Sequence, residues 1–83
     1  MTLLYFAWVR QKIGKSEETL ALPADVATVA ELAAWLAARG NGYAESFADL
    51  RRLRAAVNQT HVGFDAPISD GDEIAFFPPV TGG

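Results

Sequence analysis

The chain ends in Gly82 and Gly83, and this pair is the part of the sequence best suited to chemistry. Residues without side chains can carry the α-carboxylate of Gly83 through a passage too narrow for a Cβ atom. At average glycine usage, chance alone places two glycines at the end of roughly one chain in two hundred. We therefore expect the terminal carboxylate to be the reacting group.

The segment before the two glycines is suited to presenting them. It follows an apolar stretch and consists of Pro78, Pro79, Val80 and Thr81. Proline fixes the backbone angle φ, so two prolines reduce the conformational entropy lost when such a segment threads into a partner. The expected organisation is one folded domain at residues 1–77 and a flexible functional C-terminal tail at residues 78–83.

The other polar residues predict no catalytic constellation. The chain has no cysteine and a single histidine, His61, which leaves few ways to build a nucleophile–base pair. We interpret His61 as a surface or interface residue. The run Asp70-Gly71-Asp72-Glu73 lacks the spacing of an EF-hand and is typical of a tight turn that enters a strand. No bound metal is predicted.

Charge is distributed unevenly along the chain. Residues 1–64 carry seven Lys or Arg and six Asp or Glu, a net charge of +1, whereas residues 65–83 carry four acids and no base, a net charge of −4. The acidic segment is either a solvated turn or the contact for a positively charged partner. The charge pattern does not predict the basic surface that nucleic-acid binding needs. Arg51, Arg52 and Arg54 are typical of a solvated strand edge, and a second interpretation is that they steer an acidic partner surface.

The N-terminal residues do not resemble a targeting segment. Residues 1–9 lack the basic region and cleavage site of a signal peptide, and their apolar run is too short to span a bilayer. We expect a cytoplasmic protein that does not contact membranes.

Hydrophobic patterns predict both strands and helices. Thr28 and Glu31 have the spacing of a capping box, so a helix should begin there and end near Arg39, before Gly40. Its expected core face contains Val29, Leu32, Trp35 and Leu36, and a short second helix at 43–50 should present Tyr43, Phe47 and Leu50. Strands are expected at 3–9, 17–22, 53–57 and 73–77, with a short extended piece at 61–62.

This order of elements predicts an α+β fold. The simplest core packs the main helix and a short second helix against one face of a mixed sheet of four to five strands. Because residues 3–9 are apolar on both faces, we expect this strand at the centre of the sheet with the last strand beside it. Such an arrangement is the β-grasp, or ubiquitin-like, fold.

A resemblance to a known family covers the whole length of the chain. Its residues are Ala55-Ala-Val-Asn-Gln-Thr60, Phe64-Asp65, Pro67 and the run from Ser69 through Phe-Phe-Pro-Pro-Val-Thr to Gly83, together with Phe6 to Arg10 near the start. These residues resemble the small subunit of molybdopterin synthase, a sulfur carrier family. The Asp-Gly-Asp-Glu turn and final Gly-Gly are shared with sulfur carriers generally, including that of the thiamine pathway. His61 departs from the family, which often has an aliphatic residue there on its partner-facing sheet.

The resemblance implies a carrier cycle on Gly83. An E1-like adenylating enzyme would use ATP to convert the carboxylate to an acyl adenylate, and a sulfurtransferase or other persulfide donor would convert that to a thiocarboxylate. The large synthase subunit would then receive the tail and transfer sulfur to a cyclic pyranopterin monophosphate, forming the dithiolene of molybdopterin. The small subunit would bind no cofactor stably and contribute no catalytic side chain.

The resemblance also implies a docking surface for the large subunit, in an assembly of two small and two large subunits. The expected partner contacts are Phe77, Phe76, His61, Arg10 and Phe6. Because neighbouring residues of a strand point to opposite faces, one of Phe76 and Phe77 should belong to the core and the other to a hydrophobic patch that the partner covers.

Other functions share these features of the chain. A ubiquitin-like modifier would join Gly83 to lysines of other proteins through the same acyl adenylate, and a sulfur carrier could serve thiamine synthesis or tRNA thiolation instead. A plain β-grasp binding module, with incidental terminal glycines, is a third class.

Overall fold

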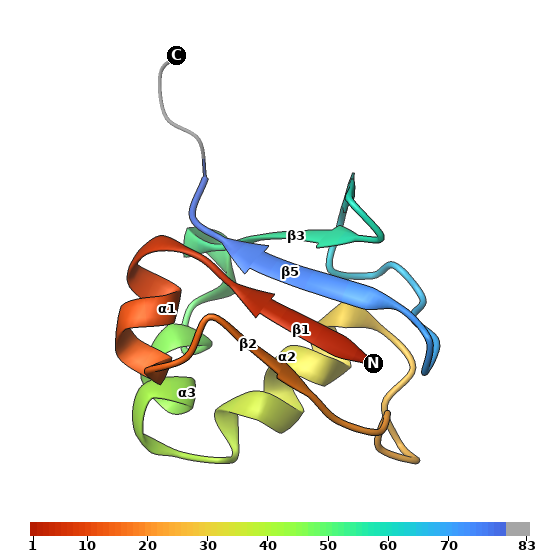
Figure 1. The fold of residues 1–83 in the computed structure, drawn as a ribbon, viewed down its shortest axis with the longest axis horizontal. Coiled ribbons are helices and arrows are strands. Elements are labelled where there is room, and N and C mark those ends of the chain that lie inside the picture. Colours follow the sequence, from red (N-terminus) through yellow and green to blue (C-terminus); the bar gives the residue numbers. More distant parts are fainter. Residues whose placement is uncertain (80–83) are drawn as a thin grey trace.

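The computed structural model describes residues 1–79, and within this range the chain forms one mixed sheet with helices on one side (Figure 1). The strands are β1 (Thr2–Tyr5), β2 (Glu17–Thr19), β3 (Arg54–Val57), β4 (Thr60–Val62) and β5 (Glu73–Phe77), in the spatial order β2-β1-β5-β3-β4. The helices are α1 (Ala7–Ile13), α2 (Val29–Ala37), α3 (Asn41–Ser46) and the 3-10 helix η1 (Leu50–Arg52). No helix in the described part of the chain is both long and apolar enough to cross a bilayer.

The centre of the sheet is the parallel pair β1 and β5, as expected from the sequence. Strand β2 pairs with β1, β3 pairs with β5, and β4 pairs with β3, all antiparallel. The predicted bounds of β5 are confirmed, and the extended piece at 61–62 belongs to β4. The α+β β-grasp architecture is therefore confirmed.

One face of the sheet and the buried stripe of α2 make the core. Leu3 and Ile74 are fully buried neighbours on β1 and β5, and Tyr5 pairs with Phe76 in the same register. Phe76 meets the Phe47 ring edge to face, with centroids 4.9 Å apart. The α2 side chains that face these strands are Val29, Leu32, Ala33 and Leu36.

The predicted start of α2 is confirmed by its capping box. The Thr28 side chain accepts a hydrogen bond from the Glu31 amide at 3.2 Å, and the Glu31 carboxylate accepts one from the Thr28 amide at 3.1 Å. The helix ends at Ala37, slightly before the expected Arg39. The predicted core position of Trp35 is wrong: its side chain is 37% exposed, because it lies about 100° around the helix from Leu36.

The predicted strand at 3–9 is also wrong beyond Tyr5. The backbone turns at Phe6, and α1 follows, with Val9 fully buried and Gly14 in the left-handed conformation at its C-terminal end. The spacing of Val9 and Ile13, followed by Gly14, is a helical signal that the apolar run concealed. Helix α1 contacts α3 so closely that a Cβ on Gly42 would overlap the Lys12 carbonyl.

A polar cluster fixes the edge strand β2 to the rest of the domain. The Glu18 carboxylate accepts hydrogen bonds from the Tyr5 and Tyr43 hydroxyls, each at 2.7 Å, and from the Arg39 guanidinium at 3.1 Å. Partial burial opposes the charged carboxylate, but these hydrogen bonds outweigh it and hold the pKa of Glu18 below its ordinary value. Burial, with the hydrogen bond to Glu18, raises the pKa of Tyr5. Glu18 therefore acts as a charged structural tie between β1, β2 and the helices.

Candidate functional site

The predicted tail begins where β5 ends. Pro78 and Pro79 are half-buried and continue directly from Phe77, and we call these three residues the exit of β5. The predicted site residues Val80, Thr81, Gly82 and Gly83 lie outside the described residues. In Figure 1 the chain after β5 leaves the sheet at the end where β1 leads into α1. The candidate site is therefore the surface around this exit.

An apolar row crosses the sheet on the face opposite the helices. The register places Leu4 beside Ala75, Ala75 beside Ala56, and Ala56 beside His61, so the row spans β1, β5, β3 and β4. Alternation along β1 and β5 puts these side chains on the opposite face from the buried Leu3, Tyr5, Ile74 and Phe76. We call the row, together with Phe77, the open face.

The two adjacent phenylalanines at the end of β5 have different positions. Phe76 is fully buried against Phe47, so the expected partner contact at Phe76 is wrong: its side chain is not accessible to a partner. Phe77 points to the open face and is only partly buried. The structure therefore confirms the expectation that one of the two belongs to the core and the other is available for contact: Phe76 is the core residue and Phe77 the accessible one.

His61 lies beside Phe77 on the open face. The His61 side chain is exposed, and its ring centroid is 5.0 Å from that of Phe77. The two rings extend the apolar row towards the exit of β5. Its location on the outer surface of the sheet agrees with the interpretation of His61 as a surface or interface residue.

Phe6 forms an exposed corner next to the exit. Its amide donates a hydrogen bond to the Phe76 carbonyl at 3.2 Å, and its side chain is 47% exposed. The corner depends on Ala7, whose φ of 55° lies in the left-handed region that a residue with a Cβ rarely adopts. Arg10 follows one turn later on α1 and is exposed. The structure thus brings Phe6 and Phe77 to the same end of the sheet.

The open face also contains residues that sequence reasoning did not single out. Leu4, Ala56 and Ala75 join it only through the pairing of strands that are distant in the sequence. Alternation in β1 and β5 could have indicated Leu4 and Ala75, but the register that aligns them has no local signal. No pocket opens in the described part of the chain, so the candidate site is a surface and not a cavity.

The acidic run at residues 70–73 is used by the fold. The Asp72 carboxylate accepts hydrogen bonds from the Asn58 side chain at 3.0 Å and from the Ser69 amide at 2.7 Å, and these lower the pKa of Asp72. Asp70 accepts a hydrogen bond from the Leu22 amide at 2.7 Å. These contacts confirm the interpretation of this run as a turn that enters β5.

Comparisons with known proteins agree with this geometry. The model of the ThiS family matches residues 3–83. The chain is 49% identical to a molybdopterin synthase sulfur carrier subunit of Escherichia coli strain K12, over 98% of this chain and 96% of that protein. A solved Pyrococcus furiosus structure, provisionally assigned as molybdopterin converting factor subunit 1, has a TM-score of 0.73 and 32% identity, and the match covers 95% of each chain. A Helicobacter pylori complex of subunits 1 and 2 of molybdopterin-converting factor shares the fold, with a TM-score of 0.62, 24% identity, and coverage of 99% of this chain and 96% of that one.

Proposed function

The chain belongs to the ThiS family, among relatives that are molybdopterin synthase sulfur carrier subunits, and on this premise we propose that it carries sulfur on the carboxyl group of Gly83. The acceptor is a cyclic pyranopterin monophosphate held by the large subunit of molybdopterin synthase. The observation that carries the proposal is the apolar open face, which is continuous with the exit of β5, four residues before Gly83.

The proposed activation has three steps on the tail. A carboxylate is a poor acyl donor, so an adenylating enzyme joins it to AMP from ATP and releases pyrophosphate. A persulfide of a sulfur donor attacks the acyl carbon, displaces AMP and forms an acyl disulfide. A thiol then cleaves the sulfur–sulfur bond, which leaves the thiocarboxylate on Gly83 and a disulfide on the donor side.

The proposed transfer returns the carrier to its starting state. The thiocarboxylate sulfur attacks an oxygen-bearing carbon of the pyranopterin and forms a thioester with Gly83. The carbon–oxygen bond at that carbon breaks, and the oxygen leaves as water or stays on the phosphate. Water hydrolyses the bond between the acyl carbon and sulfur, so the sulfur stays on the substrate and Gly83 regains its carboxylate. Two such transfers supply the two sulfurs of the dithiolene, and the large subunit provides the catalytic side chains.

The length of the tail limits where the transfer can occur. Four residues separate Pro79 from the end of Gly83, and an extended chain spans at most about 3.5 Å per residue, or roughly 14 Å in total. The acceptor pocket must therefore open within about 14 Å of the exit of β5 when the partner covers the open face. The absence of side chains at Gly82 and Gly83 suits the narrow end of such a passage.

The proposed docking surface for the large subunit is the open face with Phe6 and Arg10. Phe77, His61 and Leu4 supply aromatic and aliphatic area around two alanines, so a partner can approach the sheet closely. A heterotetramer with two copies of each subunit, an E1-like adenylating enzyme and a persulfide donor complete the proposed set of partners.

Deletion of Gly83 tests the role of the terminal carboxylate. The deletion variant is expected to lose molybdopterin formation with the large subunit, and survival of that activity would contradict the proposal. Gly71→Ala is a matched control, because nothing lies within 4 Å of a Cβ at this turn glycine and it belongs to no proposed contact.

The intact mass of the protein separates the carrier from its alternatives. Incubation with the adenylating enzyme, ATP and a sulfur donor should add about 16 Da, the difference between sulfur and oxygen in a group carrier. Adducts linked to lysine would instead support a modifier, and an unchanged mass with a competent enzyme mixture would support a plain binding module.

A further inference from the structure

Three arginines that form no ion pair with a carboxylate of residues 1–79 lie around the exit of β5. We call Arg10, Arg52 and Arg54 the exit arginines. All three are exposed, and none forms an ion pair within the described residues, whereas Lys12, Lys15, Arg39 and Arg51 each pair with an acid. The unpaired arginines therefore gather at one end of the sheet, where the tail begins.

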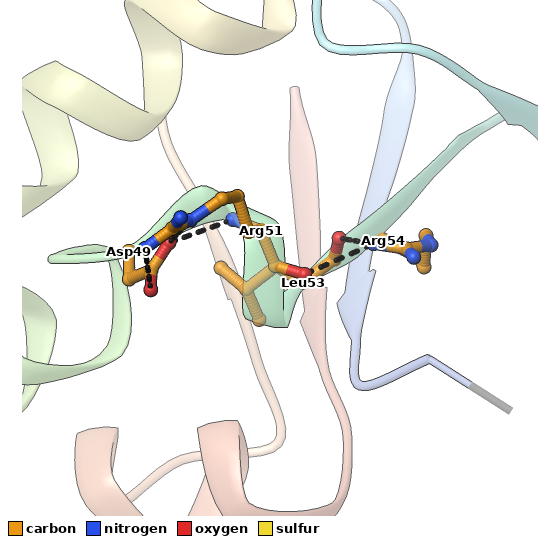
Figure 2. A network of polar contacts seen from close by, with 4 residues as sticks. All are labelled: Asp49, Arg51, Leu53 and Arg54. Atoms are coloured by element: carbon orange, nitrogen blue, oxygen red, sulfur yellow. Dashed lines mark hydrogen bonds and ion pairs between the residues drawn. The ribbon is translucent and has the colours of Figure 1, made fainter. Parts of the chain in front are cut away.

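Arg54 is directly beside the exit. It pairs with Phe77 across β3 and β5, and its guanidinium donates hydrogen bonds to the carbonyls of Leu53 at 2.7 Å and Arg51 at 3.3 Å. Figure 2 shows this guanidinium directed at the two carbonyls, with the Asp49 carboxylate on the opposite side of Arg51 and Leu53. Carbonyls orient the side chain without neutralising its charge, so Arg54 presents a positioned positive group next to Phe77.

Arg52 is held on the neighbouring element. Its guanidinium lies 5.1 Å from the centroid of the Trp8 ring, which comes from the first turn of α1. This cation–π contact fixes the charge between η1 and α1. The hydrogen bonds from Arg51 lower the pKa of Asp49 and the nearby charge of Arg52 adds to this, but Arg52 forms no direct ion pair within the described residues. Arg10 lies on α1 two residues after Trp8, about 200° around the helix axis, so it faces away from the contact of Trp8 with Arg52. Helix α1, η1 and β3 thus each contribute one exit arginine.

The acids of the domain lie mostly away from the exit. Asp70, Asp72 and Glu73 lie at the opposite end of β5, and Asp49 is occupied by two hydrogen bonds from the Arg51 side chain. Two strand acids point to the open face. Glu17 lies on β2, two strand spacings or roughly 10 Å from β5, and Glu73 lies at the end of β5 away from the exit. The surface around the exit is therefore locally positive on a protein whose net charge is −3.

We propose that the exit arginines bind carboxylate side chains that border the pocket of the large subunit into which the C-terminal tail is inserted. This assignment rests on the proposed function and names the chemistry of the partner surface. The large subunit is chosen because the arginines adjoin the apolar open face, so one partner surface can cover both. Opposite charges at the rim of such a contact guide the tail towards the pocket before the apolar surfaces meet.

Association kinetics of the full-length protein with the large subunit test the assignment. The double variant Arg52→Gln/Arg54→Gln is expected to associate about three to ten times more slowly at about 0.02 M salt, and less than about twofold more slowly at about 1 M salt. Arg52→Lys/Arg54→Lys keeps the charge and should restore most of the rate, which separates charge from lost packing on Trp8. Thermal unfolding checks that each variant is folded.

Arg51→Gln is the matched control. Like either single variant, Arg52→Gln or Arg54→Gln, it removes one positive charge from the same segment, but from a guanidinium already paired with Asp49 at 3.0 Å. Its association rate should change by less than about twofold. Equal slowing in the control and in single Arg52→Gln or Arg54→Gln variants would show an effect of net charge alone and would overturn the assignment.

Two other results would also overturn it. One is slowed association of the double variant with the adenylating enzyme but not with the large subunit. The other is binding of inorganic phosphate at the exit arginines, seen by NMR, with unchanged association with the large subunit. Failure of the proposed function has a different signature, because the wild-type proteins would then associate in a salt-dependent way without transfer of sulfur.

Discussion

Replacing Ala7 by glycine is expected to stabilise the protein. Ala7 has a φ of 55°, and its side chain is exposed, so the substitution relieves backbone strain without removing packed atoms. The same residue sets the corner that exposes Phe6 beside the exit of β5. The substitution therefore measures the strain with which the fold holds this part of the candidate site.

The magnitude follows from two opposing contributions. A left-handed conformation costs a residue with a Cβ about 1–2 kcal/mol, and glycine does not bear this cost. Glycine has more freedom in the unfolded chain, which opposes the gain by about 0.4–1 kcal/mol. The net gain should be about 0.5–1 kcal/mol, which in a domain of this size corresponds to a rise in Tm of roughly 3–6 °C.

Thermal unfolding followed by circular dichroism is the assay, with Ala34→Gly as its control. Ala34 is exposed in the right-handed helix α2, so the same chemical change there should cost about 1 kcal/mol and lower Tm. Opposite signs for one substitution at two exposed alanines would be hard to explain except by backbone conformation. A fall in Tm for Ala7→Gly as large as that for Ala34→Gly would refute the reasoning.

Three further predictions concern packing, acid stability and docking. Gly42→Ala should destabilise the fold by about 1–3 kcal/mol, because a Cβ at this position would overlap the Lys12 carbonyl. Urea unfolding measures this change, and an unchanged urea midpoint would show that α1 and α3 separate freely. Because its folded pKa is lowered, Glu18 contributes stability above its ordinary pKa of 4.5, and this stability is lost as the pH falls through the folded pKa. On acidification the Tm of Glu18→Gln should therefore fall less steeply than that of the wild type, with Asp72 still contributing to the slope. Equal slopes in the two proteins would contradict the role of Glu18. Phe77→Asp should weaken binding to the large subunit by roughly 30-fold or more while Tm stays unchanged, whereas Phe76→Ala should cost about 3–5 kcal/mol of stability. An unaffected dissociation constant for Phe77→Asp would remove Phe77 from the docking surface.

Local signals accounted for several parts of the fold. The capping box at Thr28 and Glu31 places the start of α2, because its hydrogen bonds form within one turn. Alternation along β5 is also a local signal. Neighbouring strand residues point to opposite faces whichever strands pair beside them, so Phe76 and Phe77 are expected on different faces. Local signals mislead at residues 6–9, where the apolar run favours a strand but Val9 is buried as part of helix α1.

Patterns along the chain are enough to predict the β-grasp fold, the family and the composition of the tail that ends in Gly82 and Gly83, although they miss helix α1. The side chains that share the surface around the exit of β5 are set by how distant segments pack together. Leu4, Ala56, Ala75 and His61 form one row because β1, β3, β4 and β5 pair in a particular register, and that register is set by contacts between residues far apart in the chain. The exit arginines depend on packing in part: Arg52 and Arg54 are neighbours in sequence, whereas α1, which carries Arg10, meets η1 only through tertiary contacts.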